Sequence, residues 1–153
     1  RGEMATFFSV FPNGTVWANN DRGQGYDLVM LGTDDPTVID LDALDERLKR
    51  PDHVAVAQSL EEVGFGSPIE LLSTYAGRSV DLAPWLADAR INRDRKPWLQ
   101  YQAGMEAYTE QTDDVYNDMA VYRRFPEDLF VGPEALKEEL RAAGSGRGRS
   151  PSP

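Results

Sequence analysis

The sequence predicts an α/β chain in which an antiparallel β-hairpin precedes a series of helices. Two short segments rich in β-forming residues flank a loop that contains Gly23 and Gly25, which is typical of a hairpin. Several segments with apolar residues at helical spacing follow, and some of them begin at a residue that can cap a helix.

The first elements form a helix end, a turn and two strands. Residues 1–10 are apolar and are expected to finish a helix, and Pro12, Asn13 and Gly14 then favour a turn. Strands are expected at 15–18 and 26–31, paired antiparallel, and the second is apolar enough to be buried. An isolated hairpin is marginal in water, so this one needs a larger sheet or helices packed on it.

The remaining segments are expected to be helical up to residue 143. The clearest start is Ser67, which can cap a helix with Pro68 at its first position and Glu70 in its first turn. Residues 144–153 contain only Gly, Ser, Arg and Pro, so a disordered tail is expected there. The helices are expected from Asp40, across 54–63 up to Gly64, from Ser67 to Gly77, around 83–89, from Pro97 to about 108, from Thr112, and from Pro133.

Composition excludes several classes of function. The 153 residues carry a net charge of −10 and no cysteine, which excludes disulfides and thiol nucleophiles. The acidic balance argues against nucleic acid as a partner and is compatible with cations such as polyamines. No apolar run is long enough to span a membrane and no signal segment begins the chain. The first residue is Arg1 rather than Met, which suggests a fragment.

No catalytic or metal site can be assembled from the residues. His53 is the only histidine, and no nucleophile and acid can be placed around it. The aspartates at 34, 35, 40, 42 and 45 lack the spacing of a calcium loop and fit the start of a helix. We therefore assign no catalytic residue, no metal ligand and no bound cofactor to this chain.

Three segments together resemble the spermidine synthase-like, or polyamine aminopropyltransferase, family. The segment FFSVFPNGTVW at 7–17 is similar to the family's entry into its penultimate strand, and DLVMLGT at 27–33 looks like its closing strand. The segment DARINRDRKPWLQY at 88–101 resembles a later stretch of bacterial members, many of which are fused to a membrane segment. Residues 109–140 look like an extension of that branch.

The resemblance implies the C-terminal part of a Rossmann-like, methyltransferase-type domain. Residues 1–35 would end that domain, 36–143 would form a helical extension, and 144–153 the tail. The complete parent would transfer an aminopropyl group from decarboxylated S-adenosylmethionine to a diamine such as putrescine. Its nucleotide loop and catalytic aspartates would lie upstream, so this chain would be inactive alone. We expect a cytoplasmic location, with tethering through an upstream membrane domain as an open alternative.

The resemblance also implies part of an amine pocket, formed by Phe11, Pro12 and Val16. Phe11 stands where the family has a tyrosine and lacks the hydroxyl, while Arg93 and Gln100 replace a usual threonine and glutamate, which puts putrescine itself in doubt. From the residues alone, Phe11 and Val16 could equally be core residues around the hairpin. Two other functions stay open: a non-catalytic helical interaction module, and part of an S-adenosylmethionine-dependent methyltransferase.

Overall fold

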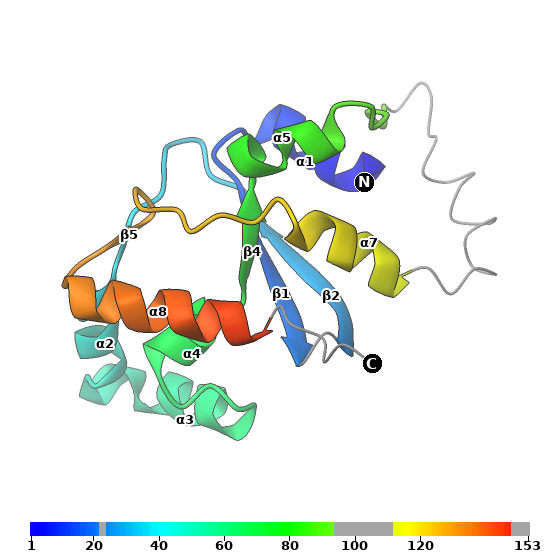
Figure 1. Ribbon diagram of the computed structural model, residues 1–153. Coiled ribbons are helices and arrows are strands. Elements are labelled where there is room, and N and C mark those ends of the chain that lie inside the picture. The colour runs from blue at the N-terminus through cyan, green and yellow to red at the C-terminus, as the bar shows by residue number, and fades with distance from the viewer. Residues whose placement is uncertain (22–23, 94–111, 148–153) are drawn as a thin grey trace.

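The computed structural model describes residues 1–21, 24–93 and 112–147. Its centre is a three-stranded antiparallel sheet, and the predicted hairpin forms two of the three strands (Figure 1). The sheet has β1 (Thr15–Asp21) in the middle, β2 (Gln24–Leu31) on one side and β4 (Tyr75–Arg78) on the other. A separate parallel pair joins β3 (Ile39–Asp40) to β5 (Phe130–Val131). The fold is thus a mixture of helices with a small antiparallel sheet.

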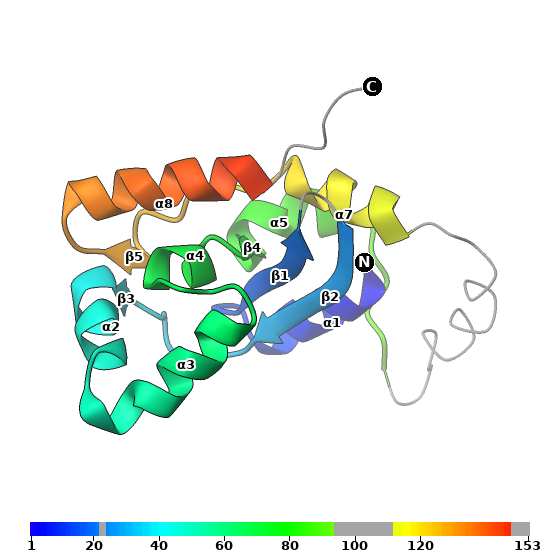
Figure 2. The same cartoon turned by 90° about the horizontal axis from the view of Figure 1, so that it is seen from below.

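Two groups of helices lie apart from each other around the sheet (Figures 1 and 2). The first group consists of α1 (Gly2–Val10), α5 (Ser79–Leu86) and α7 (Thr112–Ala120). The second consists of α2 (Leu41–Leu48), the short 3-10 helix η1 (Pro51–His53), α3 (Val54–Glu62), α4 (Pro68–Leu72) and α8 (Glu134–Arg147).

Each group of helices builds its own hydrophobic core, because side chains alternate between the two faces of the sheet. Val16 and Ala18 of β1 point into the first core, where they are 0% and 2% exposed. Trp17, which lies between them in the chain, packs against the second core. The first core also contains Met4, Phe8, Ala76, Leu82, Trp85 and Met119. The second contains Leu41, Ile69, Leu72, Tyr75, Leu129, Phe130 and Leu140.

The predicted helix starts and stops are confirmed where the sequence signal is local. Asp40 Oδ1 accepts a hydrogen bond from the Ala43 amide (3.0 Å), and Ser67 Oγ accepts one from the Glu70 amide (3.2 Å). Gly64, just after α3, has a φ of 88°, which a glycine adopts without steric cost. These interactions involve neighbours in the chain, so the sequence alone can predict them.

The helix that begins at Ser67 is shorter than predicted, and its expected end is a strand. It stops at Leu72, after which the hydroxyls of Ser73 and Thr74 bond back to the carbonyls of residues 70 and 71, each at 2.6 Å. Tyr75–Arg78 then pairs with β1. Gly77 does not end the helix; a Cβ there would lie 3.0 Å from the side chain of Leu82. Pairing with the hairpin therefore determines the conformation of this segment. Local helix signals in the sequence cannot reveal that pairing.

The second strand was expected to be buried, and this expectation is wrong. β2 lies at the edge of the sheet, and Val29 and Leu31 are 49% and 51% exposed. Leu28 and Met30, on the opposite face, are half-buried against the first core. Val29 and Leu31 share their face with the exposed Asp27, and the helices of the first core cover only the other face.

Two further expectations, for α8 and for α3, differ from the structure. The predicted tail from Gly144 begins as helix, because α8 continues to Arg147 and Ser145 Oγ donates to the Arg141 carbonyl (2.8 Å). The apolar residues of the helix expected across 54–63 do not form a buried face. Val54 of α3 is 46% exposed, and Val63, just past the helix, is 68% exposed. The helix expected from Pro97 and the rest of the tail lie outside the described residues.

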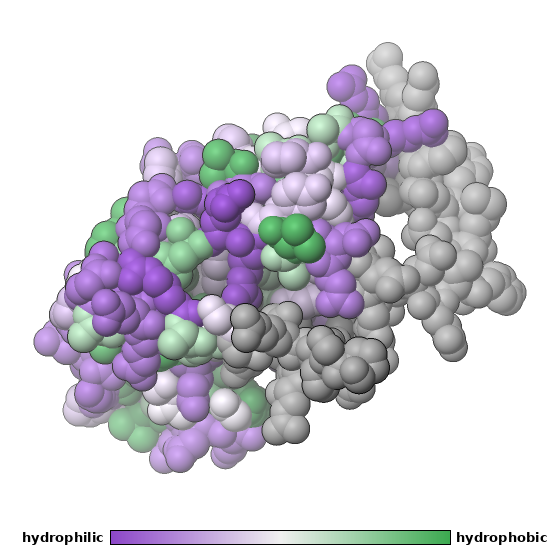
Figure 3. Space-filling model, viewed as in Figure 1, coloured by the Kyte–Doolittle hydropathy of each residue, from purple (hydrophilic) through white to green (hydrophobic). Residues whose placement is uncertain are grey.

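No helix in the described ranges is long and apolar enough to cross a bilayer. The face of the molecule in Figure 3 is mainly hydrophilic, with small separate apolar areas. This distribution agrees with the high proportion of charged residues, 27% of the sequence.

Candidate functional site: an open sheet edge beside an apolar groove

The residues that the resemblance assigns to an amine pocket lie around the start of β1. Val16 is fully buried in the first core. Phe11 is partly buried and its ring packs against Phe7, with the centroids 5.2 Å apart, while Pro12 is exposed. None of the three lines either of the hollows described below. Their contact with an amine therefore stays a prediction.

Phe11 has a clear structural role in closing the hairpin. Its ring covers Gly32, the residue after β2, and a Cβ at Gly32 would lie 2.6 Å from Phe11 Cγ. A larger residue at position 32 would have to displace the ring. The aromatic residue before the turn and the glycine after the strand, which were read as family features, are thus in direct contact.

β2 is one of the two edge strands of the sheet, and its Val29 and Leu31 are half-exposed. In the described part of the chain β2 pairs only with β1, so its other edge has no strand partner. The strand has eight residues, and its ladder with β1 places Val29 opposite Trp17 and Leu31 opposite Thr15. A strand edge without a strand neighbour is a template for pairing with another strand.

An apolar groove of about 470 Å³ lies over the face of the sheet that carries Val29 and Leu31. Val29 and Leu31 of β2 form part of its wall, Trp17 of β1 lies next to them, and Phe65 and Leu71 come from the segment around α4. The second core covers Trp17 only in part and stops short of β2. The groove and the open edge therefore form one continuous apolar face, which we call the β2 face.

Charged groups near the second core form ion pairs that connect neighbouring elements. Arg78 Nη1 donates to both carboxylate oxygens of Asp128 (2.7 and 2.8 Å), and Arg78 Nε donates to Asp81 (3.1 Å). The hydrogen bond from Arg78 lowers the pKa of Asp128 below its usual range. Burial raises the pKa of the Tyr75 phenol above its ordinary value. These contacts link β4 and the start of α5 to the loop that leads into β5.

The acidic cluster does not gather into a metal site. Asp40 caps α2, and Asp45 pairs with Lys49 one turn later in the chain. His53 Nδ1 lies 3.1 Å from Asp52. Among the described residues no three histidines or carboxylates are placed to hold an ion.

Sequence reasoning missed the groove because its wall comes from three distant parts of the chain. Val29 and Leu31 were read as buried, and Phe65 lies in a short connection without any local signal. Asp27, which shares a face with Val29 and Leu31, is a polar residue that marks this face as exposed, but the four apolar residues that follow it favour a buried strand. No protein-family model, curated protein sequence or solved structure matches this chain.

Proposed function

We propose that this chain is the C-terminal part of a spermidine synthase-like protein and contributes a docking face rather than a catalytic centre. The parent would transfer an aminopropyl group from decarboxylated S-adenosylmethionine to a diamine. The observation that carries the proposal is the open edge of β2, with Val29 and Leu31 half-exposed beside it. The occupant of this edge would be a strand from the upstream, Rossmann-like part of the same parent.

The order of elements supports this proposal. The segment with family resemblance runs through the end of α1, β1 and β2, and these elements pack together in the first core. A closing strand at the edge of this sheet would pair with a further strand in a complete domain and bury the exposed apolar side chains. β4 is the other edge strand of this sheet, but its Tyr75 and Ala76 are buried, whereas Val29 and Leu31 of β2 are half-exposed. We therefore expect the added strand at β2.

The test compares this chain with a version that includes the sequence upstream of Arg1 in its reading frame. We expect the upstream sequence to contain a strand followed by a glycine-rich nucleotide loop. The longer protein should bind decarboxylated S-adenosylmethionine in calorimetry and protect the β2 amides from hydrogen exchange. The chain alone should do neither. Saturable nucleotide binding by the chain alone, or unchanged β2 exchange in the longer protein, would contradict the proposal.

A matched pair of variants locates the docking surface. Val29 and Val54 have similar exposure, 49% and 46%, but Val54 lies on α3, away from the sheet. Val29→Lys should weaken docking of the upstream part, since it places a charge in the apolar interface, whereas Val54→Lys should not. Neither change should unfold the isolated chain, because each side chain already reaches solvent.

In the alternative, a non-catalytic interaction module, the partner would bind to α3, where Val54 and Val56 are 46% and 50% exposed. In that case Val54→Lys would abolish partner binding and the upstream sequence would lack a nucleotide loop. A methyltransferase parent would instead bind ordinary S-adenosylmethionine more tightly than its decarboxylated form. The same calorimetry on the longer protein therefore distinguishes all three functions.

A further inference from the structure

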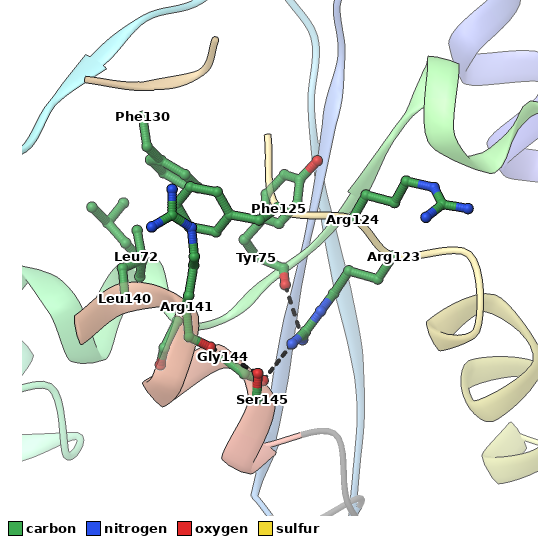
Figure 4. A pocket seen from close by; sticks show the side chains of 11 residues that line it. Leu72, Tyr75, Arg123, Arg124, Phe125, Phe130, Leu140, Arg141, Gly144 and Ser145 are labelled. Carbon is green, nitrogen blue, oxygen red and sulfur yellow. Dashed lines mark hydrogen bonds between the residues drawn. The ribbon is translucent and has the colours of Figure 1, made fainter. Parts of the chain in front are cut away.

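A second hollow, of about 300 Å³, lies between α8, β4 and the segment that follows α7 (Figure 4). Three arginines line it, Arg123, Arg124 and Arg141, and its lining includes no aspartate or glutamate. Such a concentration of positive charge is unexpected in a chain with a net charge of −10. The hollow is therefore a positively charged region on a protein that is negatively charged overall.

Only one of these arginines has its charge balanced by described carboxylates. Arg141 pairs with Glu127 (2.6 Å) and Glu134 (2.7 Å). Arg123 donates to two neutral acceptors, the carbonyl of Tyr75 (3.4 Å) and that of Gly144. Within the described ranges, no carboxylate pairs with Arg123 or Arg124. Among the described residues, the charges of Arg123 and Arg124 are thus not balanced by a paired carboxylate.

The other wall of the hollow is apolar. The guanidinium of Arg141 lies over the ring of Phe125, 4.6 Å from its centroid, and Phe125 packs against Phe130 at 5.5 Å. Leu72 and Leu140 complete this side. A ligand that fits must therefore combine an anionic group with an apolar body.

Arg123 also has a structural role, because its bonds to the carbonyls of Tyr75 and Gly144 connect β4 with α8. This role uses only some of the hydrogen-bond donors of the side chain. A guanidinium has five N–H donors in a planar fork, and two hydrogen bonds leave others free for an anion. Figure 4 shows Arg123 reaching toward Tyr75, Gly144 and Ser145, whereas the Arg124 side chain points away from the phenylalanines. Arg123 is thus the direct contact, and Arg124 adds long-range attraction at the rim.

We propose that this hollow binds a small organic anion, in which a carboxylate or phosphate group meets Arg123 and an apolar body packs against Phe125 and Leu140. Guanidinium groups bind both anions through paired hydrogen bonds, so the two share one recognition chemistry. The volume is at the lower end of the range for small-molecule sites, which favours a compact ligand. The proposal is independent of the β2 face and of any upstream sequence.

The experiment is an NMR titration of the ¹⁵N-labelled chain with benzoate and with phenyl phosphate. We expect saturable shifts of the amides at 123–125 and 144–145, and the tighter of the two probes identifies the preferred anionic group. Benzylamine has a similar ring and the opposite charge, and chloride has the charge without the ring. Equal and saturable shifts with benzylamine, equal affinity for chloride, or linear shifts with both anions would overturn the proposal.

Variants connect the binding to the named side chains. Arg123→Gln should weaken binding about tenfold or more, because charge-assisted hydrogen bonds to the anion are lost. If this variant melts early, Arg123→Lys keeps the charge without the fork and should still lose most of the affinity. Arg124→Gln should leave the melting temperature unchanged and weaken binding about threefold at low salt, with a smaller effect at high salt.

The control is Arg47→Gln, which removes the same charge on α2, outside the lining of the hollow. It should leave the affinity for both anions within error of the unchanged protein. Equal losses in Arg47→Gln and Arg124→Gln would mean that net charge alone attracts the probes. Unchanged affinity in both Arg123 and Arg124 variants would likewise overturn the assignment.

Discussion

The rings of Trp17 and Tyr75, partners in the pairing of β1 with β4, meet edge to face with their centroids 5.6 Å apart. Tyr75 makes a similar contact with Phe130 of β5 at 5.7 Å. Rings from three strands thus meet at the centre of the second core. The Tyr75 hydroxyl is buried beside them and has no hydrogen-bond partner among the described residues. Such a hydroxyl costs free energy, about 1–3 kcal/mol in typical proteins.

Removing this hydroxyl should not harm the protein. We expect Tyr75→Phe to leave the free energy of unfolding unchanged or to raise it by up to about 1 kcal/mol, since the ring contacts remain. Tyr75→Ala should lower it by roughly 3–5 kcal/mol through the cavity it creates. Urea denaturation of the three proteins measures both changes. A clear loss of stability in Tyr75→Phe would show that the hydroxyl has a partner.

The same residue predicts a loss of stability at high pH. Burial raises the pKa of Tyr75 in the folded chain, so the folded form holds this proton more tightly than the unfolded form. The stability that this provides is complete below the ordinary phenol pKa of about 10 and decreases as the pH rises above it. Tyr75→Phe should flatten the decrease in a series of denaturation curves between pH 9 and 11. An equally steep decrease in the variant would assign the effect to other groups.

The cap at Ser67 provides a test of local stability. Its hydroxyl accepts a hydrogen bond from the Glu70 amide at the start of α4, a helix of five residues whose Ile69 and Leu72 enter the second core. Ser67→Ala should lower the free energy of unfolding by about 1 kcal/mol. Ser59→Ala, at an exposed position inside α3, is the control and should have little effect. Equal stability of both variants would mean that the cap contributes nothing.

Acid stability should depend on the contact between Arg78 and Asp128. The hydrogen bond from Arg78 lowers the pKa of Asp128, so the folded chain binds this proton less readily than the unfolded chain. The stabilisation is therefore present at neutral pH and is lost as the pH falls below about 4. Because the Asp128 side chain is 75% exposed, we expect a contribution below about 1 kcal/mol.

Asp128→Asn should remove this contribution at pH 7 and bring the curves of variant and unchanged protein together near pH 3. Asp34→Asn, which alters a side chain for which the described residues show no ion pair, is the control. A difference that persists undiminished at pH 3 would point to packing and not to the charge of Asp128.

The sequence could predict those features that depend on neighbours in the chain. The caps at Asp40 and Ser67, the glycine at 64 and the hairpin of β1 and β2 are all set by local side-chain or turn chemistry. β4 was missed because Tyr75 and Ala76 follow a helix after only two residues and become a strand only by pairing with β1, some 60 residues earlier in the chain. The arginine hollow was missed for the same reason, since Arg123 meets Tyr75 and Gly144 only in the folded protein.

The same substitution at Val16 and at Val29, on adjacent strands, tests whether Val16 is a core residue or a pocket residue. Val16 is fully buried between α1, α5 and α7, whereas Val29, on the neighbouring strand and the other face, is 49% exposed. Threonine has nearly the shape of valine and a high strand propensity, so Val→Thr changes little except the polarity. Val16→Thr should cost about 1–3 kcal/mol, because it buries a hydroxyl in an apolar core. Val29→Thr should remain within about 0.5 kcal/mol, as for other surface changes. If Val16 instead lay against a solvated amine pocket, its hydroxyl could reach water and both variants would be equally stable, so denaturation of the two proteins decides between these roles.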